Sequence, residues 1–132
     1  MKKFFLTIIV CLAILTNIAN AKGAFKDDDG FSYIISPSYL VYGFGNRYCS
    51  VYDLDSIQIL ADNNSRFEFN VTGFLVSYND ESISEKRLIN IREDYGTGKI
   101  YEDGKLLEGQ AFNCGKTMRE IYFKMKSVAL KR

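Results

Sequence analysis

The side chains of this chain that could do chemistry are mostly carboxylates and tyrosine hydroxyls. The 132 residues include no histidine, so the sequence lacks the commonest general base, the commonest metal ligand and any histidine-activated nucleophile. Two carboxylate pairs, Asp53 with Asp55 and Glu93 with Asp94, have the residue types of an acid–base pair. However, carboxylates two residues apart on a strand share a face simply because it is the solvent face, and Glu93 with Asp94 begins a turn. We therefore predict no catalytic residues and no enzyme activity.

The acidic and glycine-bearing stretches do not match cofactor sites. The run Asp-Asp-Asp-Gly at 27–30 suggests a hard cation such as Ca²⁺, but it lacks the alternating ligand spacing and the closing glutamate of a calcium loop. The glycine-bearing turns at 43–45 and 96–98 open no helix, so neither is a phosphate-binding loop. The sequence thus predicts no metal ion and no cofactor.

Residues 1–21 have the parts of an export signal: a positive start, an apolar run from Phe4 to Ile18, and a small-x-small site that ends at Ala21. The apolar run is shorter than the roughly 20 residues that a membrane span needs. We therefore predict a signal peptide over 1–21, no stable membrane span after its cleavage, and an exported chain that begins at Lys22. Its destination is the periplasm, the cell surface or the medium.

The cysteines fall into two groups. Cys11 lies in the signal and leaves with it; a lipid-attachment cysteine is the alternative interpretation, but Val10 precedes it where lipoprotein signals place a small residue. Cys49 and Cys114 remain as an even pair in an oxidising compartment, which predicts one disulfide. Such a bridge would close a loop of about 65 residues and stabilise the fold by on the order of 4 kcal/mol.

The mature chain has the size and charge of one small domain. Removing 21 of the 132 residues leaves 111, enough for a single core. Loss of Lys2 and Lys3 reduces the 17 basic residues to 15 against 16 acidic ones, a net charge of −1, so we expect no nucleic-acid partner. We predict that residues 22–30 form a flexible lead-in and that residues 31–132 form a single β-rich domain.

From Phe31 onward the sequence has the pattern of an antiparallel sheet. Aromatic and β-branched residues occur in short runs separated by Gly, Asn, Asp and Ser. In the clearest run, Phe67 and Phe69 alternate with polar residues, and Gly73 interrupts an alternation that resumes from Phe74 with opposite parity, as a bulge would produce. The dipeptide Asp-Gly at 103–104 predicts a two-residue type I′ hairpin turn.

After Cys114 the period of the apolar residues changes from two to 3.6, which predicts a helix over 117–129. Thr117 with Glu120 forms a capping box at its start. The apolar stripe consists of Met118, Ile121, Tyr122, Met125, Val128 and Ala129. Because this stripe must be buried, we predict an α+β fold: a single antiparallel β-sheet with a C-terminal α-helix packed on one face, tied by one disulfide.

The tyrosines of the first third allow two interpretations. Tyrosine is both a strand former and a preferred contact residue in interfaces, so these side chains either cover a half-buried sheet or line a binding surface. The residues predicted for a partner-binding surface, with the arginine as a charged anchor, are Tyr39, Tyr42, Arg47, Tyr48 and Tyr52.

The run Tyr-Asp-Leu-Asp-Ser-Ile at 52–57, followed by a polar turn, an apolar strand and finally Cys114 before a helix, resembles the surface-adhesin protein E family of exported bacterial proteins. The resemblance covers about residues 31–128. It implies an antiparallel sheet with a C-terminal helix secured by a disulfide and, for some members, adhesion to host matrix and serum proteins. The sequence departs from the family in having Asn113 where an aspartate is usual, and Phe67 or Phe69 where a tryptophan is often found.

Two classes of function are therefore expected. The first is an exported binding protein, an adhesin-like module whose partner is a host matrix or serum protein or another envelope protein. The second is a secreted or periplasmic inhibitor or effector that occludes a protein target. A pull-down separates the two classes, because the first recovers matrix or serum proteins and the second recovers a single enzyme.

Overall fold

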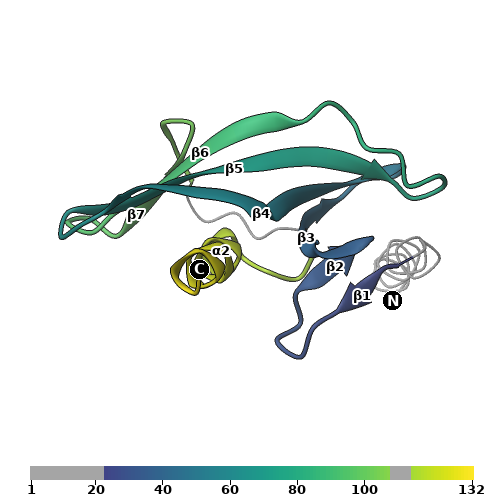
Figure 1. Cartoon of the computed structure of the whole chain (residues 1–132), viewed down its shortest axis with the longest axis horizontal. Coiled ribbons are helices and arrows are strands. Elements are labelled where there is room, and N and C mark those ends of the chain that lie inside the picture. Colours follow the sequence, from purple (N-terminus) through teal and green to yellow (C-terminus); the bar gives the residue numbers. More distant parts are fainter. Residues whose placement is uncertain (1–22, 108–113) are drawn as a thin grey trace, which may run out of the picture.

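A computed structural model of the chain describes residues 23–107 and 114–132. In these residues an antiparallel sheet has its strands in sequential order from β1 to β8, and one helix crosses it on one side (Figure 1). The elements are β1 Phe25–Lys26, β2 Ser32–Ile34, β3 Ser36–Phe44, β4 Tyr48–Asp62, β5 Arg66–Ser77, β6 Arg87–Asp94, β7 Lys99–Glu102, β8 Lys105–Leu106 and α2 Met118–Leu130. The predicted α+β class, with one antiparallel sheet and a C-terminal helix, is confirmed.

The predicted signal peptide at 1–21, including Cys11, lies outside the described residues. Within 23–107 and 114–132, no helix has both the length and the apolar character that crossing a membrane requires.

Residues 23–30 are folded against the rest of the domain and are not the loose lead-in that we expected. The strand β1 pairs with β2, and the carboxylate of Asp27 accepts hydrogen bonds from the Phe31 N–H at 2.9 Å and the Tyr33 hydroxyl at 2.9 Å. Lys124 of α2 lies 3.4 Å from the same carboxylate. Although burial opposes ionisation, these hydrogen bonds and the lysine lower the pKa of Asp27. One aspartate of the acidic run therefore closes a turn and ties it to the helix.

The buried residues of β5 change parity, but no bulge in β5 causes the change. Phe67 and Phe69 are buried in its first half, whereas Phe74 is buried and Leu75 exposed in its second half. The pairing of β5 with β6 nevertheless runs without a register shift as far as Gly73. Because successive side chains of an unbroken strand alternate between the two faces of the sheet, the residues buried in the two halves of β5 lie on opposite faces. The bulge predicted at Gly73 was wrong.

The irregularity lies instead in β4, within the segment that resembles the adhesin family. Asp53 pairs with Thr72 and Gln58 pairs with Asn70, so four residues of β4 lie opposite one residue of β5. The Ser56 hydroxyl bridges the gap, because it donates to the Asp53 carbonyl at 2.6 Å and accepts from the Thr72 N–H at 2.7 Å. The serine thus replaces a backbone group in the ladder.

Arg132 holds this bulge from the end of the helix. Its guanidinium donates to the carbonyl oxygens of Leu54 at 2.7 Å, Asp55 at 3.0 Å and Ile57 at 3.4 Å, and to the Asp55 carboxylate at 3.0 Å. Asp53 accepts from the Asp55 N–H at 3.0 Å. The two aspartates considered as an acid–base pair therefore shape the bulge and anchor the arginine.

The helix and the last hairpin form as predicted. The helix spans Met118–Leu130, and the Thr117 side chain accepts from the Glu120 N–H at 3.2 Å. Its buried residues are Met118, Ile121, Tyr122, Met125 and Ala129. In the hairpin, Asp103 and Gly104 have φ angles of 49° and 82°, and Glu102 pairs with Lys105. These elements depend on neighbours in sequence, which is why local patterns predicted them.

The predicted disulfide is wrong. Cys49 and Cys114 are both free and buried, and they are not within disulfide-bonding distance. Cys49 lies on β4 between Phe44 and Val76 of the neighbouring strands, whereas Cys114 precedes the helix. The number of cysteines shows how many thiols could pair. Whether two of them lie close enough for a disulfide depends on the fold.

We expect both thiols to resist modification in the native protein. Burial raises the pKa of Cys49 to about 11 and also raises that of Cys114, so at pH 8 both are protonated and shielded. Alkylation with iodoacetamide, read by peptide mass spectrometry, should label the two peptides far faster in denaturant than in native buffer. A Cys49–Cys114 cross-linked peptide from unreduced protein would contradict this structure.

Candidate protein-binding surface

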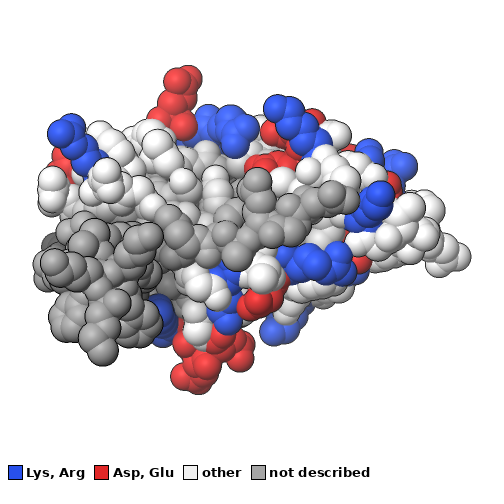
Figure 2. Space-filling model, turned by 180° about the vertical axis from the view of Figure 1, so that it is seen from behind, with Lys and Arg blue, Asp and Glu red and all other residues white. Residues whose placement is uncertain are grey.

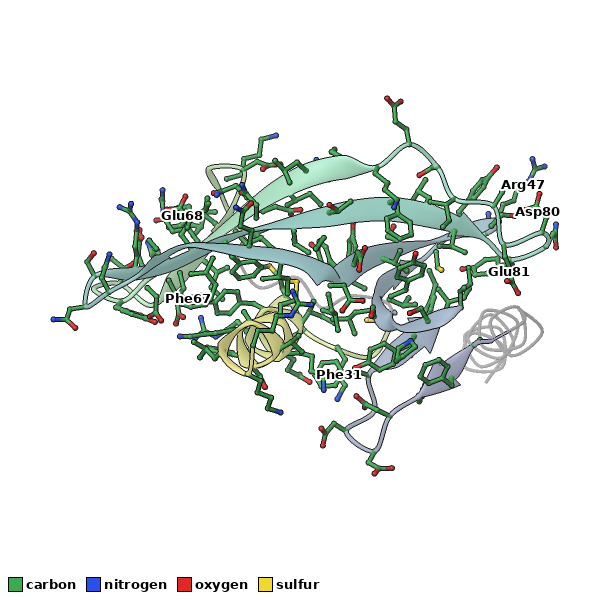
Figure 3. The ribbon with its side chains drawn as sticks, viewed as in Figure 1. Phe31, Arg47, Phe67, Glu68, Asp80 and Glu81 are labelled. Atoms are coloured by element: carbon green, nitrogen blue, oxygen red, sulfur yellow. The ribbon has the colours of Figure 1, made fainter. Side chains whose placement is uncertain are left out.

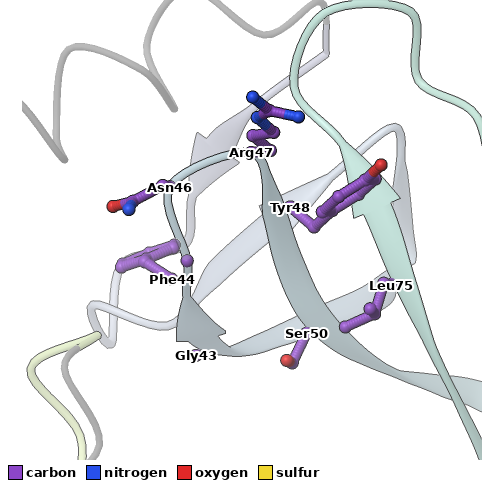
Figure 4. Close-up of a pocket in the computed structure, with 8 residues that line it drawn as sticks. Gly43, Phe44, Asn46, Arg47, Tyr48, Ser50 and Leu75 are labelled. Atoms are coloured by element: carbon purple, nitrogen blue, oxygen red, sulfur yellow. The ribbon is translucent and has the colours of Figure 1, made fainter.

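Two hollows meet on one face of the sheet near the β3–β4 hairpin. The first has a volume of about 360 Å³ and is lined by Gly43, Phe44, Gly45, Asn46, Arg47, Tyr48, Ser50 and Leu75 (Figure 4). The second has a volume of about 220 Å³ and is lined by Tyr42, Gly73, Phe74, Leu75, Ser84, Glu85 and Arg87. Leu75 lines both hollows, and we call the two together the Leu75 groove.

Strand register brings the groove residues together. Ser50 of β4 pairs with Leu75 of β5 and Gly43 of β3, and paired residues of neighbouring strands present their side chains on the same face. Tyr48, two residues before Ser50, shares this face, and Figure 4 shows Tyr48, Ser50 and Leu75 next to one another. Tyr48 is 47% exposed and Leu75 is 40% exposed. The groove therefore presents apolar surface to solvent.

Tyr78 holds the hairpin that carries Arg47 and Tyr48. Its backbone N–H donates to the Arg47 carbonyl at 3.1 Å, and its hydroxyl donates to the Gly45 carbonyl at 2.9 Å. Burial raises the pKa of Tyr78 to about 12, so this hydroxyl remains a donor at physiological pH. A Cβ at Gly45 would lie 2.9 Å from the Tyr48 carbonyl oxygen. The turn is thus closed tightly enough to require glycine.

Arg47, at the rim of the groove, has no partner among the residues that the structure describes. The other five arginines of the described residues have partners: Arg66 with Glu68, Arg87 with Asp103, Arg92 with Asp94, Arg119 with the Gly98 carbonyl, and Arg132 with Asp55. Within that part of the chain, the Arg47 guanidinium has no hydrogen bond, ion pair or aromatic contact. Figure 3 shows it at the end of the sheet, with Asp80 on the adjacent loop. Asp80 accepts a hydrogen bond from its own loop, from the Ser82 N–H at 3.0 Å.

A polar cluster lies beside the second hollow. The rings of Tyr42 and Tyr52 stack with centroids 4.0 Å apart, and the Tyr52 hydroxyl hydrogen-bonds the Glu102 carboxyl. Burial raises the pKa of Glu102 and the charge of Asp103 adds to this, while Arg87 opposes it. A raised carboxyl pKa is a property of general acids. Glu102, however, lines neither hollow, so the cluster supports the groove and does not open into it.

The structure brings together three of the five predicted contact residues. Arg47 and Tyr48 line the first hollow and Tyr42 lines the second. Ser50 and Leu75 belong to the same surface but were not predicted, because neither residue type marks a binding site. Their only signal is the strand pairing, which a single sequence does not display.

The other two predicted residues are placed elsewhere. Tyr52 is only 4% exposed and is part of the core, so its assignment to the contact surface is corrected. Tyr39 is partly buried, packs edge-on against Phe74 with ring centroids 5.0 Å apart, and lines neither hollow. The Tyr42 ring covers Tyr52, which lies on the same face of β4 as the exposed Tyr48; this contact between strands is not visible in the sequence.

On the face opposite the view of Figure 1, the described charges of the two signs are mixed. Figure 2 shows Lys and Arg interspersed with Asp and Glu over the face seen from behind. Among the described residues, no group of three or more metal-ligating side chains could hold a metal ion.

The fold and the groove define an α+β domain with a preformed surface hollow. Comparison of the chain with sequence families, with curated proteins and with solved structures finds no match. Membership of the surface-adhesin protein E family therefore stays a prediction that rests on the residues quoted above.

Proposed function

We propose that this chain is an exported, non-enzymatic binding module that contacts a protein partner through the Leu75 groove. The observation that carries the proposal is that Arg47, which has no partner in the described part of the chain, and the half-exposed Tyr48 line the same hollow on a tightly held hairpin. Arginine and tyrosine are among the residues most enriched at interface hot spots. A fixed hairpin also lowers the entropy that ordering the contact residues would cost on binding.

The partner class is proposed from the predicted export signal and from the resemblance to the adhesin family. Both support a partner outside the cytoplasm, and we propose a host matrix or serum protein, or another envelope protein. The carboxylates considered for catalysis have structural roles, which supports a binding function over an enzymatic one. Asp53 and Asp55 hold the β4 bulge, and Glu93 accepts a hydrogen bond from the Tyr122 hydroxyl of the helix.

Binding should depend on Tyr48 far more than on an equally exposed tyrosine elsewhere. We expect Tyr48→Ala to weaken binding to an immobilised panel of matrix and serum proteins by about 2 kcal/mol, roughly 30-fold in Kd. Tyr95→Ala, at 39% exposure and outside the groove, is the matched control and should leave Kd unchanged. Surface plasmon resonance measures both variants.

Thermal unfolding of the same variants separates contact from folding. If Tyr48→Ala loses binding and melting temperature together, the tyrosine is a structural residue and the groove is not the contact surface. Inhibition of one bacterial or host enzyme by the protein, in the absence of matrix binding, would support the inhibitor class instead.

A further inference from the structure

We infer that the Leu75 groove recognises a protein segment in which an acidic side chain lies close to an apolar one, with Arg47 binding the carboxylate. This inference rests on the proposed function and names the chemistry of the partner at the same surface. It is carried by the charge of Arg47, which no residue within 23–107 and 114–132 pairs with, and by the exposed apolar side chains beside it.

The carboxylate is assigned to Arg47 because this guanidinium is free to bind one. A guanidinium is always charged and presents a planar set of N–H donors that matches a carboxylate in a bidentate pair. Arg87, at the other end of the groove, lies 3.5 Å from the Asp103 carboxylate. The two arginines of the groove therefore differ, and only Arg47 is without an acidic partner among the described residues.

The nearby acidic side chains do not replace that partner. Asp80 accepts a hydrogen bond from the Ser82 N–H, and hydrogen bonds from this serine lower its pKa. No carboxylate of the described residues lies within ion-pair distance of Arg47, and Figure 3 shows Glu81 below the ribbon where Arg47 lies above it. Among the described residues, the Arg47 guanidinium therefore has no internal carboxylate that competes with a ligand.

The apolar part of the segment is assigned to the first hollow. Tyr48 and Leu75 are exposed there, next to Ser50, and Phe44 contributes to the lining. An apolar side chain inserted here buries area on both partners, which is favourable at about 25 cal/mol per Å². The Ser50 hydroxyl and the Asn46 amide supply hydrogen-bonding groups for the backbone of the segment.

The charge of the groove favours a single acid over a polyanion. Glu85 lines the second hollow, so an anion that followed the groove to that end would meet a like charge. A nucleic acid, with a phosphate at every nucleotide, fits this arrangement less well than a peptide with one carboxylate at the Arg47 end. The occupant that we infer is therefore a protein segment.

Two blocked peptides that differ in one charge test the inference. Acetyl-Leu-Asp-Leu-amide and acetyl-Leu-Asn-Leu-amide are titrated into ¹⁵N-labelled protein and followed by NMR. We expect the aspartyl peptide to shift the Arg47 Nε–Hε signal and the amides of 43–50 and Leu75, with at least a fivefold lower Kd than the asparaginyl peptide. Arg47→Gln should remove this difference. Arg66→Gln, which changes an arginine outside the groove, should keep it.

The outcomes separate this inference from the proposed function. Equal affinity for the two peptides, or a difference that survives Arg47→Gln, overturns carboxylate recognition, and the proposal that the groove binds a protein still stands on the Tyr48→Ala result. A preference for the aspartyl peptide that depends on Arg47 supports carboxylate recognition. If Tyr48→Ala leaves binding to the protein panel unchanged, that result overturns the proposed contact surface but not carboxylate recognition by Arg47. Amide spectra of both arginine variants verify that each remains folded.

Discussion

Replacing Ile121 with aspartate should lower the free energy of unfolding by several kcal/mol. Ile121 is 1% exposed on the face of α2 that packs on the sheet, so the variant must bury a charge without a partner or detach the helix. A loss of this size is a large part of the about 5–15 kcal/mol that stabilises a typical domain. Urea unfolding followed by circular dichroism measures it.

The matched control is Leu130→Asp, which introduces the same charge at a position of the same helix that is 54% exposed. We expect that variant to cost under about 1 kcal/mol. Lys124 also lies off the apolar stripe, but it is unsuitable as a control because it pairs with Asp27 and lies over the Phe31 ring. Equal unfolding midpoints for Ile121→Asp and Leu130→Asp would refute the orientation of the helix.

Removing the Glu93 carboxylate should be almost as costly. Glu93 is buried under α2, where it accepts from the Tyr122 hydroxyl at 2.7 Å and from Lys126 Nζ at 3.0 Å. Burial, and then the bond to Glu93, raises the pKa of Tyr122, so this hydroxyl donates over the whole physiological range. Glu93→Ala leaves the mostly buried Lys126 ammonium without its carboxylate, for which we expect a loss of about 3–5 kcal/mol in the free energy of unfolding.

The neighbouring carboxylate provides the comparison for Glu93. Asp94 forms an ion pair with Arg92 at 3.1 Å on a partly exposed face, so Asp94→Ala should cost under about 1 kcal/mol. The double variant Glu93→Leu with Lys126→Met should recover most of the loss, because an apolar pair of similar volume needs no desolvation of charge. If Glu93→Ala and Asp94→Ala unfold at the same urea concentration, the Glu93 network does not hold the helix to the sheet.

The carboxylates at 93 and 94 illustrate how a strand separates neighbours. As adjacent residues of β6 they point to opposite faces of the sheet, so one is buried against the helix and the other pairs with Arg92. We expected these two residues to begin a turn, but both belong to β6. The alternation of the strand places their carboxylates on opposite faces, so they do not meet at one site.

The sequence by itself determined the elements that depend on near neighbours. The Asp103-Gly104 turn, the cap formed by Thr117 and Glu120, and the buried stripe of the helix all agree with the structure. Each depends on dihedral preferences or hydrogen bonds that span only a few residues, so a local pattern is sufficient to predict it.

Only the tertiary structure decided which side chains form the groove and which form the core. Tyr48 and Tyr52 lie on the same face of β4, in a stretch that pairs with β5 without a register shift. Tyr52 is buried under the Tyr42 ring of the neighbouring strand, whereas Tyr48, at the start of the strand, is exposed. The same long-range geometry brings Leu75 beside Ser50 and keeps Cys49 apart from Cys114. These outcomes depend on contacts between residues that are far apart in the sequence. A local sequence pattern does not predict such contacts.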